Sequence, residues 1–299
     1  MRFTSLMGEG LHRLPPRLHE LLPPEQRADL RHRLGRFRPW EDGYDLAPPT
    51  LGPVETVGPP DFVGVGTLLG GARWWYRLIA EHPCVSTRDD IGMERHFLSH
   101  FCTDPFGDDE IERYHGWFPR RAGSIAGEWT PGYMAQPWVA PLLARAAPAA
   151  RLLVMVRDPV ERLRLGLARP SDDRTSQIGS HIADAVDRGF YARQLRRLLE
   201  FFPIEQVHVL QYEGCIADPM GQLEATYRFL HLDNAYRPPA LLRSTRETTG
   251  SIPSIDADTT SRLVDLYASD VAELVTLVPR LDLSLWPAFV DDGSGPGAG

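Results

Sequence analysis

Lysine is absent from this chain. All 32 basic residues, in a length of 299, are therefore arginine. A guanidinium is planar, always charged and able to make two parallel hydrogen bonds, whereas an ammonium is a compact point charge. A binding or catalytic role that other proteins give to lysine must pass here to arginine or be lost.

Cysteine and long apolar runs are also scarce. The three cysteines, Cys84, Cys102 and Cys215, are too scattered for a disulfide framework or a CxxC metal site, which favours a reducing compartment and no metal. No apolar run approaches the ~18 residues of a membrane span. The start, MRFTSLMGEG, lacks the charged-then-apolar order of a signal peptide. We expect a cytoplasmic protein with no membrane partner.

The charge is moderately acidic, at a formal net value of −8. This argues against a general binder of nucleic acid, although it leaves room for a local basic pocket. The composition, with 42% hydrophobic and 24% charged residues, is that of an ordinary globular chain. Its length suffices to bury a core without disulfides.

The chain divides into three parts. Residues 1–60 are rich in proline and arginine and read as a peripheral arm with one helical stretch at 24–37, more typical of a solvated helix than of a binding element. Residues 61–290 form the predicted main domain. Residues 291–299, with the sequence DGSGPGAG at their end, predict a flexible tail.

Short apolar runs alternate with helical patterns along the main domain. This alternation predicts an α/β fold, a central parallel sheet flanked by helices. The continuous apolar run 151–156, RLLVMV, is typical of a strand buried on both faces. The expected strands are 61–66, 124–128, 151–156 and 207–212, and the expected helices are 73–81, 159–168, 191–202, 220–230 and 261–277.

A glycine-containing turn follows the first strand and opens the first helix. Backbone N–H groups of such a turn, together with a helix N-terminus, can bind a phosphate. The turn carries Gly66, Gly70 and Gly71, with Arg73 in the first helical turn. By itself the pattern is as typical of plain turn chemistry. Arg73 is equally compatible with clamping a phosphate and with pointing to solvent.

Five segments in order resemble the PAPS-dependent sulfotransferases, closest to their carbohydrate and bacterial small-molecule branches. The family pattern is a strand, G-x-x-K-[SG]-G-T-[TS] and a helix ending in H-P, and the resemblance spans roughly residues 60–290. The matching segments are DFVGVG…GG…WWYRLIAEHP at 61–83, MERHF at 93–97, GEWTPGY at 127–133, RDPVER at 157–162, and GFY…L…FP…V…YE…DP…FL over 189–230.

The resemblance implies a sulfotransferase fold with a phosphate-loop-like turn, the co-substrate PAPS, and a small-molecule or carbohydrate acceptor. It assigns Gly66, Gly70, Gly71 and Arg73 to the donor loop, and Arg157 and Arg162 to the donor's 3′-phosphate. It also implies that Glu94 takes the acceptor's proton, although the residue alone is as typical of a surface or capping glutamate.

The sequence departs from the family where the donor's charge would be met. Leu69 stands at the family's loop lysine, and Ala72 and Arg73 at its hydroxyl pair. Leu165 and Met93 replace a 3′-phosphate serine and a further lysine. Because hydrogen bonds to charged groups contribute about 1.5–3 kcal/mol each, these losses predict a rate roughly 10³-fold lower or more, unless Arg73 compensates.

The acceptor side has weaker candidates. His96 would share a face with Glu94 if the segment were a strand, but a structural histidine is the alternative. Thr130 and Tyr133 would shape a pocket wall or begin a helix. Trp74, with Trp75, would pack the helix on the sheet, with one face free for an acceptor.

Three functions remain open from sequence. The first is an active sulfotransferase. The second is an enzyme of the same fold that has lost PAPS and performs acid–base chemistry with Glu94 or His96. The third is a binding protein without catalysis, because fold alone does not decide function.

Overall fold

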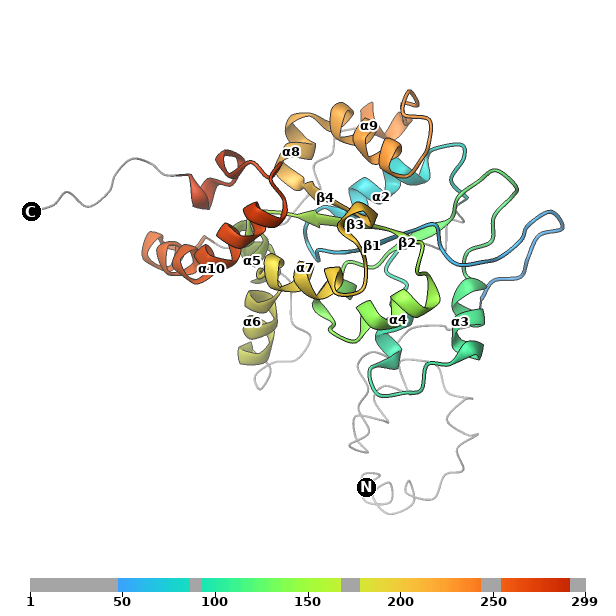
Figure 1. The fold of residues 1–299 in the computed structure, drawn as a ribbon. Coiled ribbons are helices and arrows are strands. Elements are labelled where there is room, and N and C mark those ends of the chain that lie inside the picture. The colour runs from blue at the N-terminus through green and yellow to red at the C-terminus, as the bar shows by residue number, and fades with distance from the viewer. Residues whose placement is uncertain (1–47, 87–92, 168–177, 243–253, 291–299) are drawn as a thin grey trace, which may run out of the picture. The chain divides into compact units, whose positions relative to one another are not determined.

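The computed structural model describes residues 48–86, 93–167, 178–242 and 254–290 (Figure 1). The chain divides into two units, Met1–Ala47 and Pro48–Gly299. The expected helix at 24–37 and the expected tail lie outside the described residues. Residues 48–60 were expected to belong to the arm; Thr56 pairs with Arg120 of the second unit in an antiparallel bridge.

A four-stranded parallel sheet forms the centre, which confirms the predicted fold class. Its strands are β1 (Phe62–Gly66), β2 (Gly127–Trp129), β3 (Arg151–Val156) and β4 (Val207–Gln211), in the order β2-β1-β3-β4. Val63 of β1 pairs with Glu128 on one side and with Leu152 on the other. Almost every strand residue is buried, as expected for a parallel sheet covered on both faces.

Helices cover the two faces of this sheet. Figure 1 shows α2 (Ala72–Ala80), α8 (Tyr212–Ala217) and α9 (Pro219–Phe229) on one side, and α4 (Val139–Ala146) and α7 (Tyr191–Leu199) on the other. The remaining helices are α3 (Asp108–His115), α5 (Pro159–Leu167), α6 (Ile178–Asp187) and α10 (Ala257–Leu277). Across the described ranges, no helix is long and apolar enough to cross a membrane.

The α2 face is joined by both packing and hydrogen bonds. Trp75 is fully buried and its Nε1–H donates to Thr226 Oγ1 of α9 at 3.0 Å. Tyr227 of α9 returns a hydrogen bond to the carbonyl of Leu78 at 2.8 Å. Truncating a buried tryptophan costs about 3–5 kcal/mol. These contacts therefore hold the start of α2, and the loop before it, at a fixed place on the sheet.

All the elements expected in the main domain are present, with shifted ends. The run 151–156 is a strand at the predicted bounds, whereas Tyr212, expected to end a strand, begins α8. Helices α3, α4, α6 and α8 were not among the elements expected from the sequence. The sequence of α3, DDEIERYH, is mostly charged, and the helix buries only Tyr114. It therefore lacks the repeating apolar positions by which a helix is predicted from sequence.

Candidate active site

The glycine loop, residues 67–71, joins β1 to α2 over the carboxyl end of β3. The backbone N–H and the Oγ1–H of Thr67 both donate to the carbonyl of Met155, at 2.9 and 2.7 Å. Gly70 N–H then closes the turn on Thr67 O at 3.1 Å. The loop is therefore tied to the sheet edge where parallel α/β folds bind ligands.

The glycines of this region are required by close contacts. A Cβ on Gly66 would lie 2.8 Å from Met134 Sδ, and one on Gly70 would lie 2.7 Å from the Met155 carbonyl. Gly71 has φ 98° and a Cβ there would lie 2.4 Å from the Tyr212 ring. Larger residues would push the loop off the sheet, so these three positions serve the tight backbone path that the sequence pattern predicted.

The loop and the first turn of α2 leave several backbone donors open. In the described part of the chain, no acceptor is found for the N–H groups of Leu68, Leu69, Gly71 and Ala72. These groups lie at a helix N-terminus, where the helix dipole adds partial positive charge. This is the arrangement that binds a phosphate or sulfate.

Leu69 supplies no charge to this loop. Its backbone is left-handed, with φ 66°, and its Cδ1 lies 3.8 Å from a Cβ built on Gly166 of α5. Leu165, on the same helix, is 7% exposed. The Leu69 side chain, which stands at the family's lysine position, therefore lies against α5.

Arg73 and Glu94 form an ion pair. Arg73 Nη2 lies 2.7 Å from Glu94 Oε1, and the two side chains are 50% and 41% exposed. From the sequence, Arg73 was equally compatible with clamping a phosphate and with pointing to solvent. In the structure its guanidinium contacts the candidate base, Glu94. An exposed pair of this kind contributes little stability, so a stronger anionic partner can displace it.

Glu94 and His96 lie in an irregular loop and not in a strand, so the condition under which they would share one face is not met. Both have left-handed backbones, with φ 53° and 54°, which interrupt extended geometry. Glu94 N–H donates to Trp129 O at 2.9 Å, and His96 N–H donates to Thr130 Oγ1 at 3.3 Å. Two hydrogen bonds to the β2 end thus hold the loop.

His96 is mainly neutral at pH 7. Burial lowers its pKa, Glu94 opposes this effect, and the Arg188 guanidinium lowers the pKa further. A neutral imidazole can accept a proton or donate a hydrogen bond.

A buried carboxyl cluster lies beneath this loop. Glu128 is fully buried and accepts hydrogen bonds from Thr130 Oγ1 at 2.6 Å, Tyr114 OH at 2.7 Å and Tyr133 OH at 3.3 Å. Burial raises its pKa, and the hydrogen bonds from the three hydroxyls and the charge of Arg95 offset only part of this rise. Thr130 and Tyr133 therefore face Glu128, and their predicted contact with a substrate stays a prediction. The family resemblance included Glu128 in the segment GEWTPGY, but it gave this glutamate no role.

Arg157 lies at the carboxyl end of β3, as predicted. Its guanidinium carbon lies 4.4 Å from the ring centre of Tyr212, in cation–π contact. Its Nε is buried and has no acceptor among the described residues. Trp74 packs edge-on against the same Tyr212 ring, at 6.3 Å. Tyr212 thus connects Arg157, Gly71 and Trp74, a role that the sequence did not reveal.

Two carboxylates fix the backbone around Arg157. Asp158 accepts from Val160 N at 2.9 Å and from Ala288 N at 2.9 Å. Glu213 accepts from Asp158 N at 2.9 Å and from Trp286 Nε1 at 2.9 Å. Burial raises the pKa of both carboxyls. The first half of RDPVER is therefore held rigidly.

Arg162 has different surroundings. It is 1% exposed, and its Nη2 donates to the carbonyl of Ala185 in α6, beside Tyr267 of α10. Arg157 instead lies on Tyr212 of α8. The two arginines of RDPVER thus enter different layers, and a 3′-phosphate role for Arg162 stays a prediction. The described residues contain no group of three His, Cys, Asp or Glu side chains suited to a metal ion.

The fold and this site define an α/β protein with a glycine-containing strand–turn–helix whose N–H groups are open, and an acid–arginine pair at the helix start. The family model described as "Sulfotransferase family" matches residues 94–236. The chain is related to the sulfotransferase family, which confirms the resemblance found in the sequence. The sequence departs most from the family pattern in the glycine loop. The segment that the family model matches begins after this loop.

Three similar proteins illustrate the relationship. The human heparan sulfate glucosamine 3-O-sulfotransferase 3B1 is 29% identical over 188 residues, 58% of this chain and 46% of that protein. The mouse heparan sulfate glucosamine 3-O-sulfotransferase 6 is 28% identical, with coverage of 58% and 52%. The crystal structure of a sulfotransferase from Alicyclobacillus acidocaldarius aligns with a TM-score of 0.62 at 25% identity, covering 77% of this chain and 99% of that one. The chain spans about half the length of the curated relatives it matches.

Proposed function

We propose that this chain transfers a sulfuryl group from PAPS to a hydroxyl group of a small molecule or sugar. The Arg73–Glu94 contact of 2.7 Å carries the proposal. It brings the candidate base to the N-terminus of the helix whose open N–H groups suit the donor's phosphate. The relatives' names, which specify glucosamine 3-O-sulfotransferases, support a sugar hydroxyl as acceptor.

The donor's charges find partners at two places. The open N–H groups of Leu69, Gly71 and Ala72 suit the 5′-phosphate end, because they belong to the glycine loop and the first turn of α2. The unpartnered Nε of Arg157 suits the 3′-phosphate, since a guanidinium can bind phosphate through two hydrogen bonds. Both places lie at the carboxyl edge of the sheet, where a single nucleotide can reach both.

The chemistry requires one proton transfer and one exchange of bonds to sulfur. Glu94 accepts the proton of the acceptor hydroxyl while the acceptor oxygen forms its bond to sulfur. The sulfur–oxygen bond to the 5′-phosphate breaks, and its electron pair leaves on PAP. Arg73 is paired with the base, and on donor binding its guanidinium can turn from Glu94 to the phosphate, which frees the carboxylate.

The missing lysine defines the competing functions. Leu69 offers no charge where the leaving phosphate gains it, which favours other acid–base chemistry or binding alone in the same cleft. We also propose that residues 61–290 form the sulfotransferase domain and that residues 1–60 form an arm before it. The protein is proposed to work in the reducing cytosol. The free state of Cys84, Cys102 and Cys215 agrees with that location.

Replacement of the base tests the proposal. Glu94→Gln keeps the side-chain shape but accepts no proton, so turnover of PAPS with a panel of sugar and phenol acceptors should fall about 10²-fold or more. PAP affinity, measured by calorimetry, should change by less than about threefold, since Glu94 makes no donor contact in this scheme. Glu112→Gln, on the exposed side of α3, is the matched control. Near-normal turnover in Glu94→Gln would remove Glu94 as the base.

A further inference from the structure

The chain returns to the sheet after α10. This C-terminal segment, residues 280–289, contains the short helices Leu283–Leu285 and Pro287–Phe289. Gln211, the last residue of β4, exchanges two hydrogen bonds with Asp282: Gln211 Nε2 donates to Asp282 O at 2.8 Å, and Asp282 N donates to Gln211 Oε1 at 3.0 Å. The C-terminal segment is therefore fixed at the carboxyl edge of the sheet, where the donor is proposed to bind.

Trp286 anchors this segment in the core. Its side chain is fully buried, and its Nε1–H donates to Glu213 Oε2 at 2.9 Å. The centre of its ring lies 6.3 Å from that of Tyr191. Trp286 therefore contacts α8 through Glu213 and α7 through Tyr191.

Glu213 and Tyr191 both bind the peptide group between Arg157 and Asp158. Glu213 Oε1 accepts from Asp158 N–H at 2.9 Å, and Tyr191 OH donates to Arg157 O at 2.8 Å. A peptide group is planar, so hydrogen bonds at its two opposite ends fix its orientation. This orientation restricts the direction in which the Arg157 side chain leaves the backbone.

The guanidinium end of Arg157 contacts the same turn of α8. Tyr212 directly precedes Glu213, and its ring centre lies 4.4 Å from the guanidinium carbon. Two neighbouring residues of α8 thus contact Arg157 at its guanidinium and at the peptide group that follows it.

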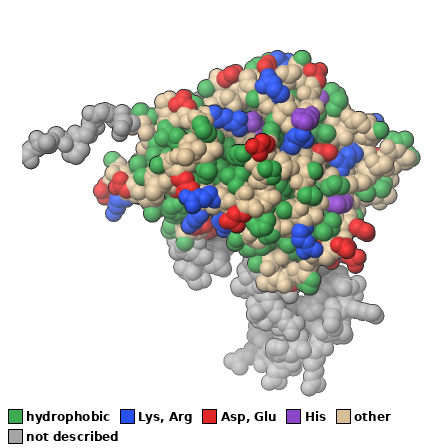
Figure 2. Space-filling model, in the orientation of Figure 1, with side chains coloured by type: hydrophobic (Ala, Val, Ile, Leu, Met, Phe, Trp, Pro, Cys, Tyr) green, Lys and Arg blue, Asp and Glu red, His purple; other side chains and the backbone are tan. Residues whose placement is uncertain are grey.

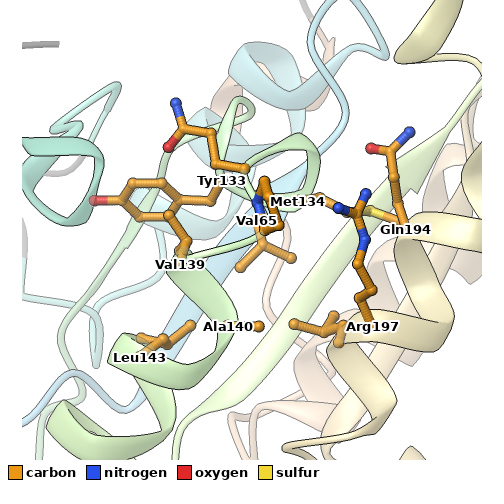
Figure 3. Close-up of a pocket in the computed structure, with 11 residues that line it drawn as sticks. Val65, Tyr133, Met134, Val139, Ala140, Leu143, Gln194 and Arg197 are labelled. Carbon is orange, nitrogen blue, oxygen red and sulfur yellow. The ribbon is translucent and has the colours of Figure 1, made fainter. Parts of the chain in front are cut away.

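Tyr191 is held in place because α7 packs on the sheet. Tyr191, Leu195 and Leu198 are buried, and Figure 3 shows Arg197 of the same helix extending toward Met134. The Tyr191 hydroxyl therefore reaches the Arg157 carbonyl from a well-packed helix.

The direction of a single arginine matters in this protein because its overall charge does not favour anions. The formal net charge is −8. On the face shown in Figure 2, arginine and acidic side chains are interspersed, without a continuous basic area among the described residues. Affinity for a phosphate therefore depends on how individual guanidinium groups are placed, since two parallel hydrogen bonds require a matched orientation.

We propose that Trp286 is a positioning residue of the donor site, which acts through Glu213 and Tyr191 to direct Arg157 at the donor's 3′-phosphate. This inference rests on the donor site proposed above. Without the Trp286 N–H, the Glu213 carboxylate loses one of the partners that orient it, and its bond to Asp158 N–H weakens. Arg157 then takes up directions in which it makes one hydrogen bond to the phosphate instead of two.

Two neutral substitutions test this role by calorimetric titration of PAP into the full chain. Trp286→Phe and Tyr191→Phe each remove one hydrogen-bond donor without a change of charge, so a Coulombic effect on the phosphate is excluded. Each should weaken PAP binding at least about threefold, because the second hydrogen bond to phosphate is made less often. In the Arg157→Ala background, Trp286→Phe should cost less than about 1.5-fold more, because the residue through which it acts is gone.

Tyr267→Phe is the matched control. Tyr267 is fully buried and its hydroxyl donates to Val186 O at 2.9 Å, which is the same kind of bond at a place away from Arg157. This variant should change the affinity for PAP by less than about 1.5-fold, since sites without a shared partner act independently.

Tyr191→Phe also guards against a folding defect in Trp286→Phe, because it keeps the buried ring. Both variants should unfold cooperatively in urea. An equal loss of affinity in Tyr267→Phe, or a full further loss from Trp286→Phe in the Arg157→Ala background, would overturn the inference in favour of a general loosening. PAP binding that depends on Arg157 but is unchanged in either phenylalanine variant would overturn the inference alone. Absence of PAP binding to the wild-type chain would overturn the donor site and this inference with it.

Discussion

Replacing Thr130 by valine should weaken both the fold and the reaction. Thr130 Oγ1 donates to the buried Glu128 Oε2 at 2.6 Å and accepts from His96 N–H at 3.3 Å. Valine has almost the same shape, so the cavity stays filled while both hydrogen bonds disappear. The carboxyl of Glu128 would lose one of its three hydroxyl partners in a fully buried position.

The size of the effect follows from the two lost hydrogen bonds. A hydrogen bond contributes about 0.5–1.5 kcal/mol net, so Thr130→Val should lower the free energy of unfolding by about 1–3 kcal/mol. For a domain of this size that is roughly 2–12 °C in Tm. Thr130→Ser keeps the hydroxyl and removes one methyl group, at a cost of about 1 kcal/mol. The serine variant should also retain turnover, because the loop at Glu94 and His96 stays attached.

Urea unfolding and turnover with PAPS, measured on both variants, test this reasoning. The valine variant should lose more stability than the serine variant, and its kcat should fall while its KM for PAPS stays near the wild-type value. Equal stabilities would show that the Thr130 hydroxyl carries no net energy. An intact kcat in the valine variant would show that the bond to His96 does not position the loop.

Further predictions concern the glycine loop and acid stability. Leu69→Lys combined with Ala72→Thr should raise both the affinity for PAP and the rate of sulfuryl transfer to a phenol. If Arg73 already supplies the missing charge, Arg73→Ala will abolish the native activity and the added lysine will contribute little. PAP titrations and activity assays on both variants distinguish these outcomes. Burial lowers the pKa of His208 to about 3, so its unfolded form alone gains a proton as the pH falls from about 6.5, and stability should drop by about 2 kcal/mol between pH 7 and 5. His208→Gln should remove the part of the acid sensitivity that His208 contributes, as urea titrations at the two pH values will show, whereas His231→Asn, at an exposed position, should not.

The fold was predictable because its signals are local. The run 151–156 is apolar at every position after the first, as is typical of a strand covered on both faces. The amphipathic pattern of 191–202 predicted α7 in the same way. By contrast, α3 buries only Tyr114, so its pattern is too weak to separate it from a loop.

The candidate site was less predictable because it depends on distant contacts. Glycines at 70 and 71 indicated the loop, and their close approaches to Met155 and Tyr212 explain them. The Arg73–Glu94 pair spans 21 residues and needs two left-handed residues that no local propensity favours. The burial of Glu128 is equally a product of tertiary packing, since its hydrogen-bond partner Tyr114 comes from α3, 14 residues earlier in the chain.

Calorimetric titration of PAP into the full chain tests the central claim most directly. PAP is the desulfated product, so its binding is independent of the unidentified acceptor. We predict a single site whose affinity falls at least about tenfold in Arg157→Ala. The variant lacks the guanidinium that lies on Tyr212, and with it the two hydrogen bonds proposed to the phosphate. The absence of PAP binding at millimolar concentration, or an affinity unchanged in Arg157→Ala, would contradict the proposed donor site.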